Sequence, residues 1–123
     1  MLLKGFYTLN KVAKLKDNEY EASIHLNKDH DIYKGHFPGN PITPGVCMVQ
    51  ILKEVTSTIT EQKLVMKSSN NIKFMALINP EKNPDLRLNI IVNTDTEGEI
   101  HVKNICYFDE TVALKMSVKY SIL

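Results

Sequence analysis

The sequence predicts an α+β fold in which one antiparallel sheet wraps around one long central helix. Apolar side chains alternate with period two in the first part of the chain and again in its last half, as they do in half-buried strands. Residues 46–62, between those parts, instead repeat apolar side chains every three or four positions, which is typical of a helix. The length of 123 residues suits a single domain, 1–123, with one core.

The N-terminal part is expected to form a β-hairpin. Residues 6–15 are β-like, residues 19–26 alternate cleanly between apolar and polar side chains, and the Lys-Asp-Asn stretch at 16–18 is a turn signal. Residues 27–45 are then crowded with glycine and proline. That crowding predicts a segment without regular structure.

The central helix is expected from Val46 to about Gln62, with Pro44 close to its first turn. Its apolar positions are Val46, Val49, Leu52, Val55 and Ile59, and its polar stripe is Gln50, Glu54, Ser57 and Glu61. The Val-Thr-Ser-Thr stretch at 55–58 has low helix propensity. Burial against the sheet must therefore stabilise this helix.

The last half of the chain predicts four more strands. They are expected at 64–78, 86–92, 100–108 and 112–122, separated by turn signals, which is the spacing of an antiparallel meander. A small sheet around one helix leaves an edge strand and one sheet face incompletely protected. Dimerisation through sheet edges is therefore a reasonable expectation.

Composition excludes several classes of partner. The charged fraction is 24% and the formal net charge is +1, so there is no global attraction to nucleic acid or to an anionic membrane. No apolar window approaches the length of a membrane span, and we expect a cytoplasmic protein. Cys47 and Cys106 form no recognisable motif and are expected to be reduced thiols, and no metal site is expected.

The most specific motif is the loop before the helix, His-Phe-Pro-Gly-Asn-Pro-Ile-Thr-Pro-Gly-Val at residues 36–46. It resembles the signature of the β-hydroxyacyl-acyl carrier protein dehydratases, which have the hot dog fold. The order of the expected elements agrees with that fold over nearly the whole chain. The Ile-Lys-Phe stretch at 72–74 also lies where the family has a similar strand start.

The resemblance implies an activity and an assembly. Members of the family dehydrate 3-hydroxyacyl thioesters to trans-2-enoyl thioesters, without metal or organic cofactor, on chains carried by an acyl carrier protein. It implies a homodimer or higher oligomer with active sites at the subunit interface and an acyl tunnel beside the central helix. One histidine and one carboxylate from opposite subunits perform the chemistry.

The loop can supply two of the three groups that the elimination needs. His36 can take the proton from C2, because a neutral imidazole titrates near working pH. The amide N–H groups of Gly45 and Val46 lie at the start of the helix and can stabilise charge on the thioester oxygen. By the same resemblance Phe37, Pro38 and Gly39 are expected to bind substrate.

The third group, the acid, is missing where the family has it. The family acid lies fourteen residues after the histidine, and that position here is Gln50. An amide can orient a water but has no acidic proton. Glu54 stands four residues later, where the family commonly has glutamine, so the pair looks exchanged. Glu54 is either a substitute acid on the same helix face or a solvated surface charge.

Three functions therefore stay open. The leading hypothesis is a 3-hydroxyacyl-thioester dehydratase; the second is an attenuated homologue that binds acyl chains or pairs with an active subunit. The third is a hot dog thioesterase in which Glu54 activates a water. Five basic residues form either a patch for an acidic carrier protein or a scattered solvated set. They are Lys63, Lys67, Lys73, Lys82 and Arg87.

Overall fold

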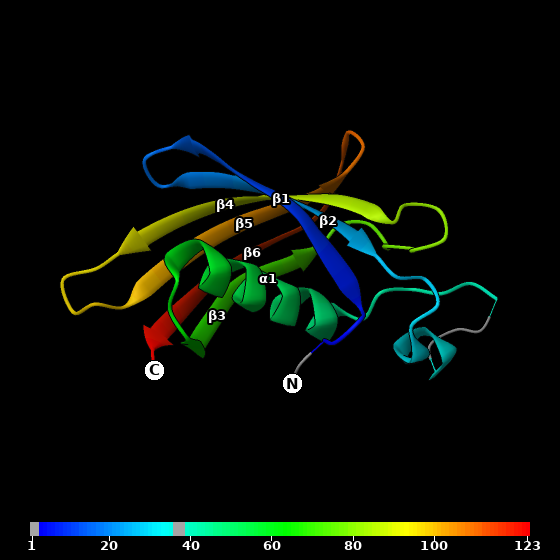
Figure 1. The fold of residues 1–123 in the computed structure, drawn as a ribbon, viewed down its shortest axis with the longest axis horizontal. Helices are drawn as coiled ribbons and strands as arrows, with labels where there is room; N and C mark the ends of the chain where they lie inside the picture. Colours follow the sequence, from blue (N-terminus) through cyan, green and yellow to red (C-terminus); the bar gives the residue numbers. More distant parts are fainter. Residues whose placement is uncertain (1–2, 36–38) are drawn as a thin grey trace.

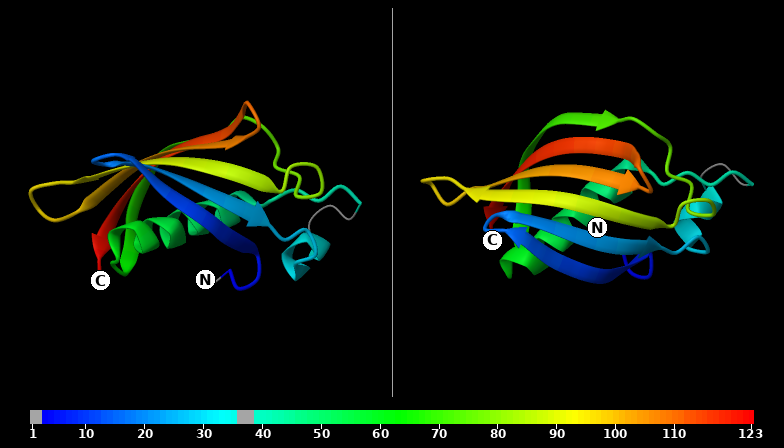
Figure 2. Two further views of the ribbon diagram at one scale, coloured as in Figure 1. Left: turned by 45° about the horizontal axis from the view of Figure 1, so that its top comes forward. Right: turned by 90° about the horizontal axis from the view of Figure 1, so that it is seen from above.

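The computed structural model describes residues 3–35 and 39–123. Six strands in this part form one antiparallel sheet that curls around one α-helix (Figures 1 and 2). The elements in chain order are β1 (Tyr7–Lys16), β2 (Glu19–Leu26), the 3₁₀ helix η1 (Asp31–Gly35), α1 (Gly45–Thr60), β3 (Leu64–Phe74), β4 (Asp85–Thr94), β5 (Ile100–Phe108) and β6 (Thr111–Ile122). The predicted fold class, an α+β hot dog fold, is confirmed.

The strand order differs from the predicted meander. The sheet runs β1-β2-β4-β5-β6-β3, so only β4, β5 and β6 follow one another as a meander. β3 pairs with β6, and residues 75–84 carry the chain across to β4, which pairs with β2 (Figure 2). The meander prediction was wrong for β3 because turn signals report where the chain turns and not which neighbour a strand finds.

Two expected boundaries also change. The strand expected at 64–78 ends at Phe74, after which the N–H groups of Met75 and Ala76 both bond to the Ala113 oxygen. The segment expected to lack regular structure contains η1, in which the Tyr33 N–H donates to the His30 oxygen. Tyr33 is buried there and stacks on Phe6 at 5.1 Å between ring centroids, so aromatic packing stabilises this turn.

The helix begins one residue and ends about two residues before the expected positions, and four of its five expected apolar side chains, all but Val46, lie in or against the core. It ends at Thr60 because Glu61 takes the left-handed conformation, with φ 56°, and its N–H caps the Ser57 oxygen. Its buried side is formed by Cys47, Met48, Ile51, Leu52, Val55 and Thr56. Val46, expected on the apolar side, is 69% exposed. Because each residue turns the helix by about 100°, Val46 points away from the buried side that Met48 occupies. Val46 therefore contributes to a different surface of the helix.

A β-bulge in β3 decides which side chains face the helix. The register between β3 and β6 shifts between Asn70 and Lys73, and Asn71 has φ 53°. In an unbroken ladder Ile72 would pair with Lys115, whereas here Lys73 does. The extra residue thus turns Ile72 and Phe74 toward α1 and Lys73 toward the opposite face of the sheet.

No helix within residues 3–35 and 39–123 has the length and apolar character that crossing a membrane requires.

Candidate active site

The expected base lies outside the described residues. His36, Phe37 and Pro38 are not among residues 3–35 and 39–123, so their roles stay predictions. Gly39, the next residue of the motif, is described and has φ 86°, a conformation that favours glycine. The loop then returns to the body of the molecule, where the Thr43 N–H donates to the Ile78 oxygen at 2.8 Å and the Thr43 hydroxyl bonds to Tyr33 Oη at 2.9 Å.

The start of α1 carries unpaired donors. Pro44 precedes the helix in an extended conformation, and no side chain among the described residues caps the first turn. The N–H groups of Cys47 and Met48 bond to the Pro44 oxygen, whereas those of Gly45 and Val46 lie too early in the helix for an intrahelical acceptor. These two donors, together with the positive end of the helix dipole, suit a developing oxyanion.

Gly45 is required by close packing as well as by its position. A Cβ atom built there would lie 2.7 Å from Cζ of Phe74, closer than non-bonded carbons approach. Phe74 comes from β3, and the bulge described above turns its ring toward the helix start. The ring therefore lies directly beside the amide groups that the site needs.

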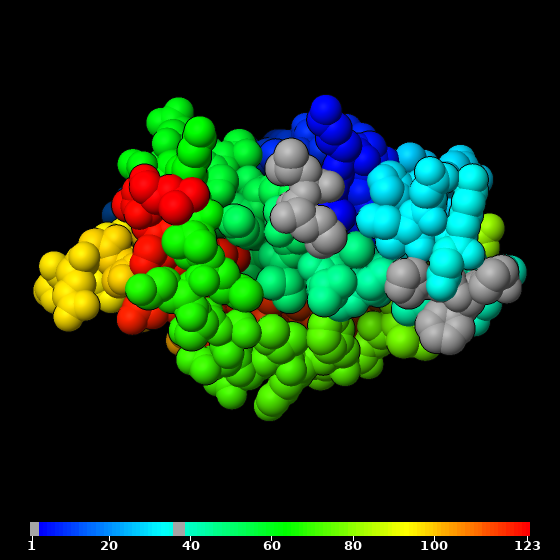
Figure 3. Space-filling model, turned by 90° about the horizontal axis from the view of Figure 1, so that it is seen from below, coloured from blue at the N-terminus to red at the C-terminus, as the bar shows by residue number. Residues whose placement is uncertain are grey.

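An apolar groove runs between α1 and β3 from this point. It has a volume of about 600 Å³ and is lined by Gly45, Val46, Val49, Met66, Ser69, Ile72 and Phe74. Figure 3 shows that α1 and β3 both lie at the surface on this side of the molecule. A smaller hollow of about 230 Å³ shares Gly45 and Phe74 with it. The volume and apolar lining suit an acyl chain.

Gln50 and Glu54 are hydrogen-bonded to each other on the helix. Gln50 Nε2 donates to Glu54 Oε2 at 2.9 Å, and Tyr7 Oη donates to Glu54 Oε1 at 2.8 Å. Burial, then the hydrogen bond to Glu54 and its charge, raise the pKa of Tyr7, which keeps its proton and acts as the donor. Glu54 is half-buried with both carboxylate oxygens engaged, and is therefore not a solvated surface charge.

The groove and the carboxylate lie on different flanks of α1. Glu54 follows Val49 by five residues, which is about 140° around the helix. Val49 lines the groove on the β3 side, whereas Glu54 bonds to Tyr7 on β1. Gln50 lies between the two directions. Tyr7 carried no functional signal in the sequence, because only packing brings β1 against the helix across 47 residues.

Neither the cysteines nor the five basic residues line the apolar groove, although neighbours of Lys67 and Lys73 on β3 do. Cys47 and Cys106 are free and buried, and burial raises the pKa of both thiols, that of Cys106 to about 12. Within the described residues no group of three or more His, Cys, Asp or Glu is arranged to hold a metal ion. The five basic residues do not form one patch, because β5 and β6 separate Arg87 on β4 from Lys73 on β3.

Comparison with protein families matches residues 12–106 to the ApeI-like family, described as ApeI dehydratase. The chain belongs to the ApeI-like dehydratase family. The matched range contains the whole loop, α1 and β3, and begins after Tyr7. The curated 3-hydroxyacyl-acyl-carrier-protein dehydratase FabZ of Sulfurimonas denitrificans is 26% identical, over 96% of this chain and 87% of its own length.

Solved structures agree on the fold of this ApeI-like chain. The dehydratase heterocomplex ApeI:P from Xenorhabdus doucetiae superposes with a TM-score of 0.69 at 19% identity, covering 93% of this chain and 96% of that one. A mutant thioesterase from Pseudomonas aeruginosa superposes with a TM-score of 0.65 at 11% identity, covering 92% and 80%. The same fold thus serves a dehydratase complex and a thioesterase, so the fold does not choose between the two activities.

Proposed function

We propose that this ApeI-like chain is a dehydratase that converts 3-hydroxyacyl thioesters, carried by an acyl carrier protein, into trans-2-enoyl thioesters. The observation that carries the proposal is the junction of the apolar groove with the unpaired Gly45 and Val46 amides. An acyl chain in the groove would bring its thioester carbonyl to donors that strengthen as the oxyanion forms. Membership of the ApeI-like family supports the same reaction.

The proposed chemistry is an elimination in which each proton has a named place. His36 takes the proton from C2, and the electron pair of that bond passes through the thioester, whose oxygen the Gly45 and Val46 amides stabilise. The C3–O bond then breaks, the C2–C3 double bond forms, and the departing hydroxyl leaves as water once it receives a proton. Glu54 is the proposed donor, with Gln50 holding its carboxyl group.

Proton donation is the demanding step in this proposal. Glu54 accepts hydrogen bonds from Tyr7 and Gln50 on its two oxygens, as a carboxylate does, so Glu54 must first take up a proton to act as a donor. A missing or slow acid lowers a rate by roughly 10² to 10⁴ without abolishing it. A dehydratase slower than its relatives is therefore expected.

We propose that the working unit is a homodimer in the cytoplasm, with groups from two subunits in each active site. Two observations support it. β3 is an edge strand that exposes apolar side chains, with Met66 at 43% and Phe74 at 56%. The groove and Glu54 also lie on different flanks of α1, so a second subunit is the simplest way to bring a carboxylate to the groove.

Gln50 favours a second function, an acyl-binding subunit of low activity that pairs with an active partner. In that case the groove holds the chain and the partner supplies the acid. The protein would bind an acyl carrier without turning over its substrate.

One assay separates these functions. The protein is incubated with a 3-hydroxyacyl carrier protein and the products are followed by mass spectrometry for wild type, His36→Ala, Gln50→Glu and Glu54→Gln. A dehydratase forms the enoyl product, loses it in His36→Ala and slows in Glu54→Gln. The matched control is His25→Ala, an exposed histidine bonded to Asp85, which leaves the rate unchanged.

Other results reject the proposal. No dehydration by wild type, with recovery in Gln50→Glu, assigns the low-activity subunit instead. Release of free acid and thiol identifies a thioesterase, in which Glu54 would activate a water.

A further inference from the structure

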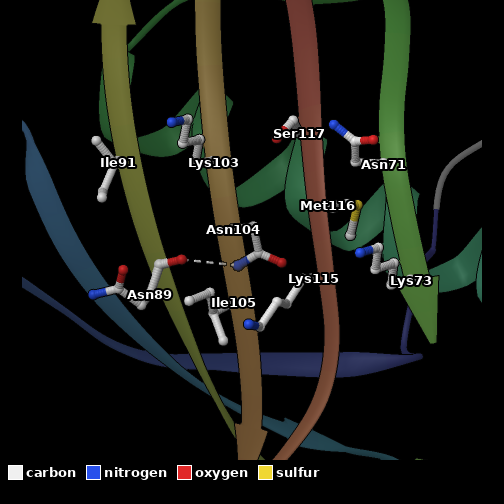
Figure 4. A pocket seen from close by; sticks show the side chains of 10 residues that line it. All are labelled: Asn71, Lys73, Asn89, Ile91, Lys103, Asn104, Ile105, Lys115, Met116 and Ser117. Atoms are coloured by element: carbon white, nitrogen blue, oxygen red, sulfur yellow. Dashed lines mark hydrogen bonds between the residues drawn. The ribbon is translucent and has the colours of Figure 1, made fainter. Parts of the chain in front are cut away.

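A second hollow lies on the face of the sheet turned away from α1. It has a volume of about 530 Å³ and is lined by residues of β3, β4, β5 and β6, with α1 behind the strands in Figure 4. It shares no lining residue with the apolar groove. Its volume falls in the range of small-molecule sites, roughly 300–1,000 Å³. It therefore requires its own explanation.

Three lysines gather at this hollow in an arrangement that costs stability. Lys73 on β3 and Lys115 on β6 are directly opposite each other in the sheet. Lys103 on β5 pairs with Ser117 and so lies diagonal to Lys115. Like charges directly opposite each other destabilise a sheet. The bulge in β3 creates this pairing, because without its extra residue Ile72 would face Lys115.

No acidic side chain in the described part of the protein neutralises these lysines. The hollow has neither Asp nor Glu in its lining, and none of the ion pairs between described residues includes Lys73, Lys103 or Lys115. Glu19 and Glu21 on β2 contact other groups: Glu19 accepts from Asn89 Nδ2, and Glu21 lies 3.6 Å from Arg87. The three positive charges are left for something outside the chain.

The rest of the lining indicates what kind of anion fits. Ile91, which pairs with Lys103, and Ile105, which pairs with Lys115, add apolar surface beside these lysines (Figure 4). The Asn71 amide and the Ser117 hydroxyl add polar groups. A lysine ammonium binds a phosphate group as a point charge. Apolar side chains make no favourable contact with an inorganic anion, but they can pack against the carbon skeleton of a larger ligand.

We propose that this outer face of the sheet binds a small organic phosphate, with the phosphate between Lys73, Lys103 and Lys115 and its organic part against Ile91 and Ile105. The proposal does not rest on the dehydration reaction. It explains why the bulge places two lysines opposite each other, since the bound phosphate offsets their repulsion.

The test is a titration of the whole ¹⁵N-labelled protein at constant ionic strength, followed through backbone amide shifts. The probes are adenosine 5′-diphosphate and its two parts, pyrophosphate and adenosine, with sodium chloride as the reference anion. Saturable shifts at Lys73, Lys103 and Ser117 are expected with the diphosphate, weaker ones with pyrophosphate and none with adenosine. No saturable shift with either phosphate overturns the proposal.

Paired variants distinguish a site from general attraction to a basic surface. Lys115→Gln is expected to weaken diphosphate binding at least fivefold and to remove the phosphate-dependent rise in Tm, without lowering the Tm in phosphate-free buffer. Lys11→Gln makes the same charge change at an exposed position of β1 and should have no effect. Equal losses in both variants overturn the proposal, because they show binding by net charge alone.

Discussion

The two flanks of α1 differ in chemistry although they belong to one helix. The flank toward β3 is apolar and open, with Val46 and Val49 along a groove of about 600 Å³. The flank toward β1 is polar and closed, with Glu54 held by Tyr7 and Gln50. An acidic side chain on the polar stripe of the helix therefore does not reach the substrate groove by that placement alone. The direction in which the side chain is held matters as much.

The buried side of α1 stabilises the fold. Shortening one of its side chains should have the largest effect on the free energy of unfolding. Ile51→Ala removes a fully buried side chain and is expected to lower the free energy of unfolding by about 2–5 kcal/mol. Val46→Ala, on the open flank, should change it by less than about 0.5 kcal/mol, since Val46 is 69% exposed. Urea unfolding measures both, and equal losses would contradict the distinction between the flanks.

Gly45→Ala tests the open flank. The new Cβ would lie 2.7 Å from the Phe74 ring, which is half-exposed and can move. We expect overpacking to lower the free energy of unfolding by about 1–3 kcal/mol. We also expect the displaced ring to weaken the binding of an acyl chain in the groove. Binding of a fluorescent fatty acid measures the effect. The double variant Gly45→Ala, Phe74→Ala should recover binding. A failure to recover would show that the clash with the Phe74 ring is not the cause of the weaker binding.

Tyr7→Phe tests the closed flank by removing one hydroxyl. The loss of the hydrogen bond to Glu54 is expected to cost about 1 kcal/mol of stability and to free the carboxylate for other contacts. If that contact restrains Glu54, the dehydration rate and its pH profile should change as well. Tyr107→Phe is the matched control, because its ring contact with Arg87 needs no hydroxyl. Identical pH profiles for both variants would show that Tyr7 has only a structural role.

The smallest expected effect concerns alkaline pH. Burial raises the pKa of Tyr7 and Tyr120 in the folded protein, and that of Tyr33 to about 12, from the ordinary 10.0. The unfolded chain therefore loses these protons first, and stability should fall as pH rises above 10. Glu54→Gln should lower the pKa of Tyr7 alone, because its charge is removed while burial remains. Tyrosine ¹³Cζ shifts in NMR titrations measure each pKa. An unchanged pKa of Tyr7 in this variant would contradict its contact with Glu54.

The amino-acid pattern was enough to predict the kind and order of the elements. Periodicity located the helix to within about two residues at each end, and the order of the elements predicted the hot dog fold. The loop motif indicated the 3-hydroxyacyl-acyl carrier protein dehydratases, and the ApeI-like family match and the FabZ relative agree with that prediction. These features depend on neighbours close in the chain, which a pattern records directly. The closeness of Gln50 and Glu54 could be predicted as well, because the two residues are separated by about one helical turn and their hydrogen bond is local.

Features that depend on partners distant in the chain could be found only in the folded structure. β3 pairs with β6 and not with β4, and a bulge of one residue sends Phe74 to the groove and Lys73 to the outer hollow. Tyr7 meets Glu54 across 47 residues. The physical reason is the same in each case. A one-residue change of register exchanges the two faces of a strand, and the free energy that selects the register comes from packing against elements far away in the sequence.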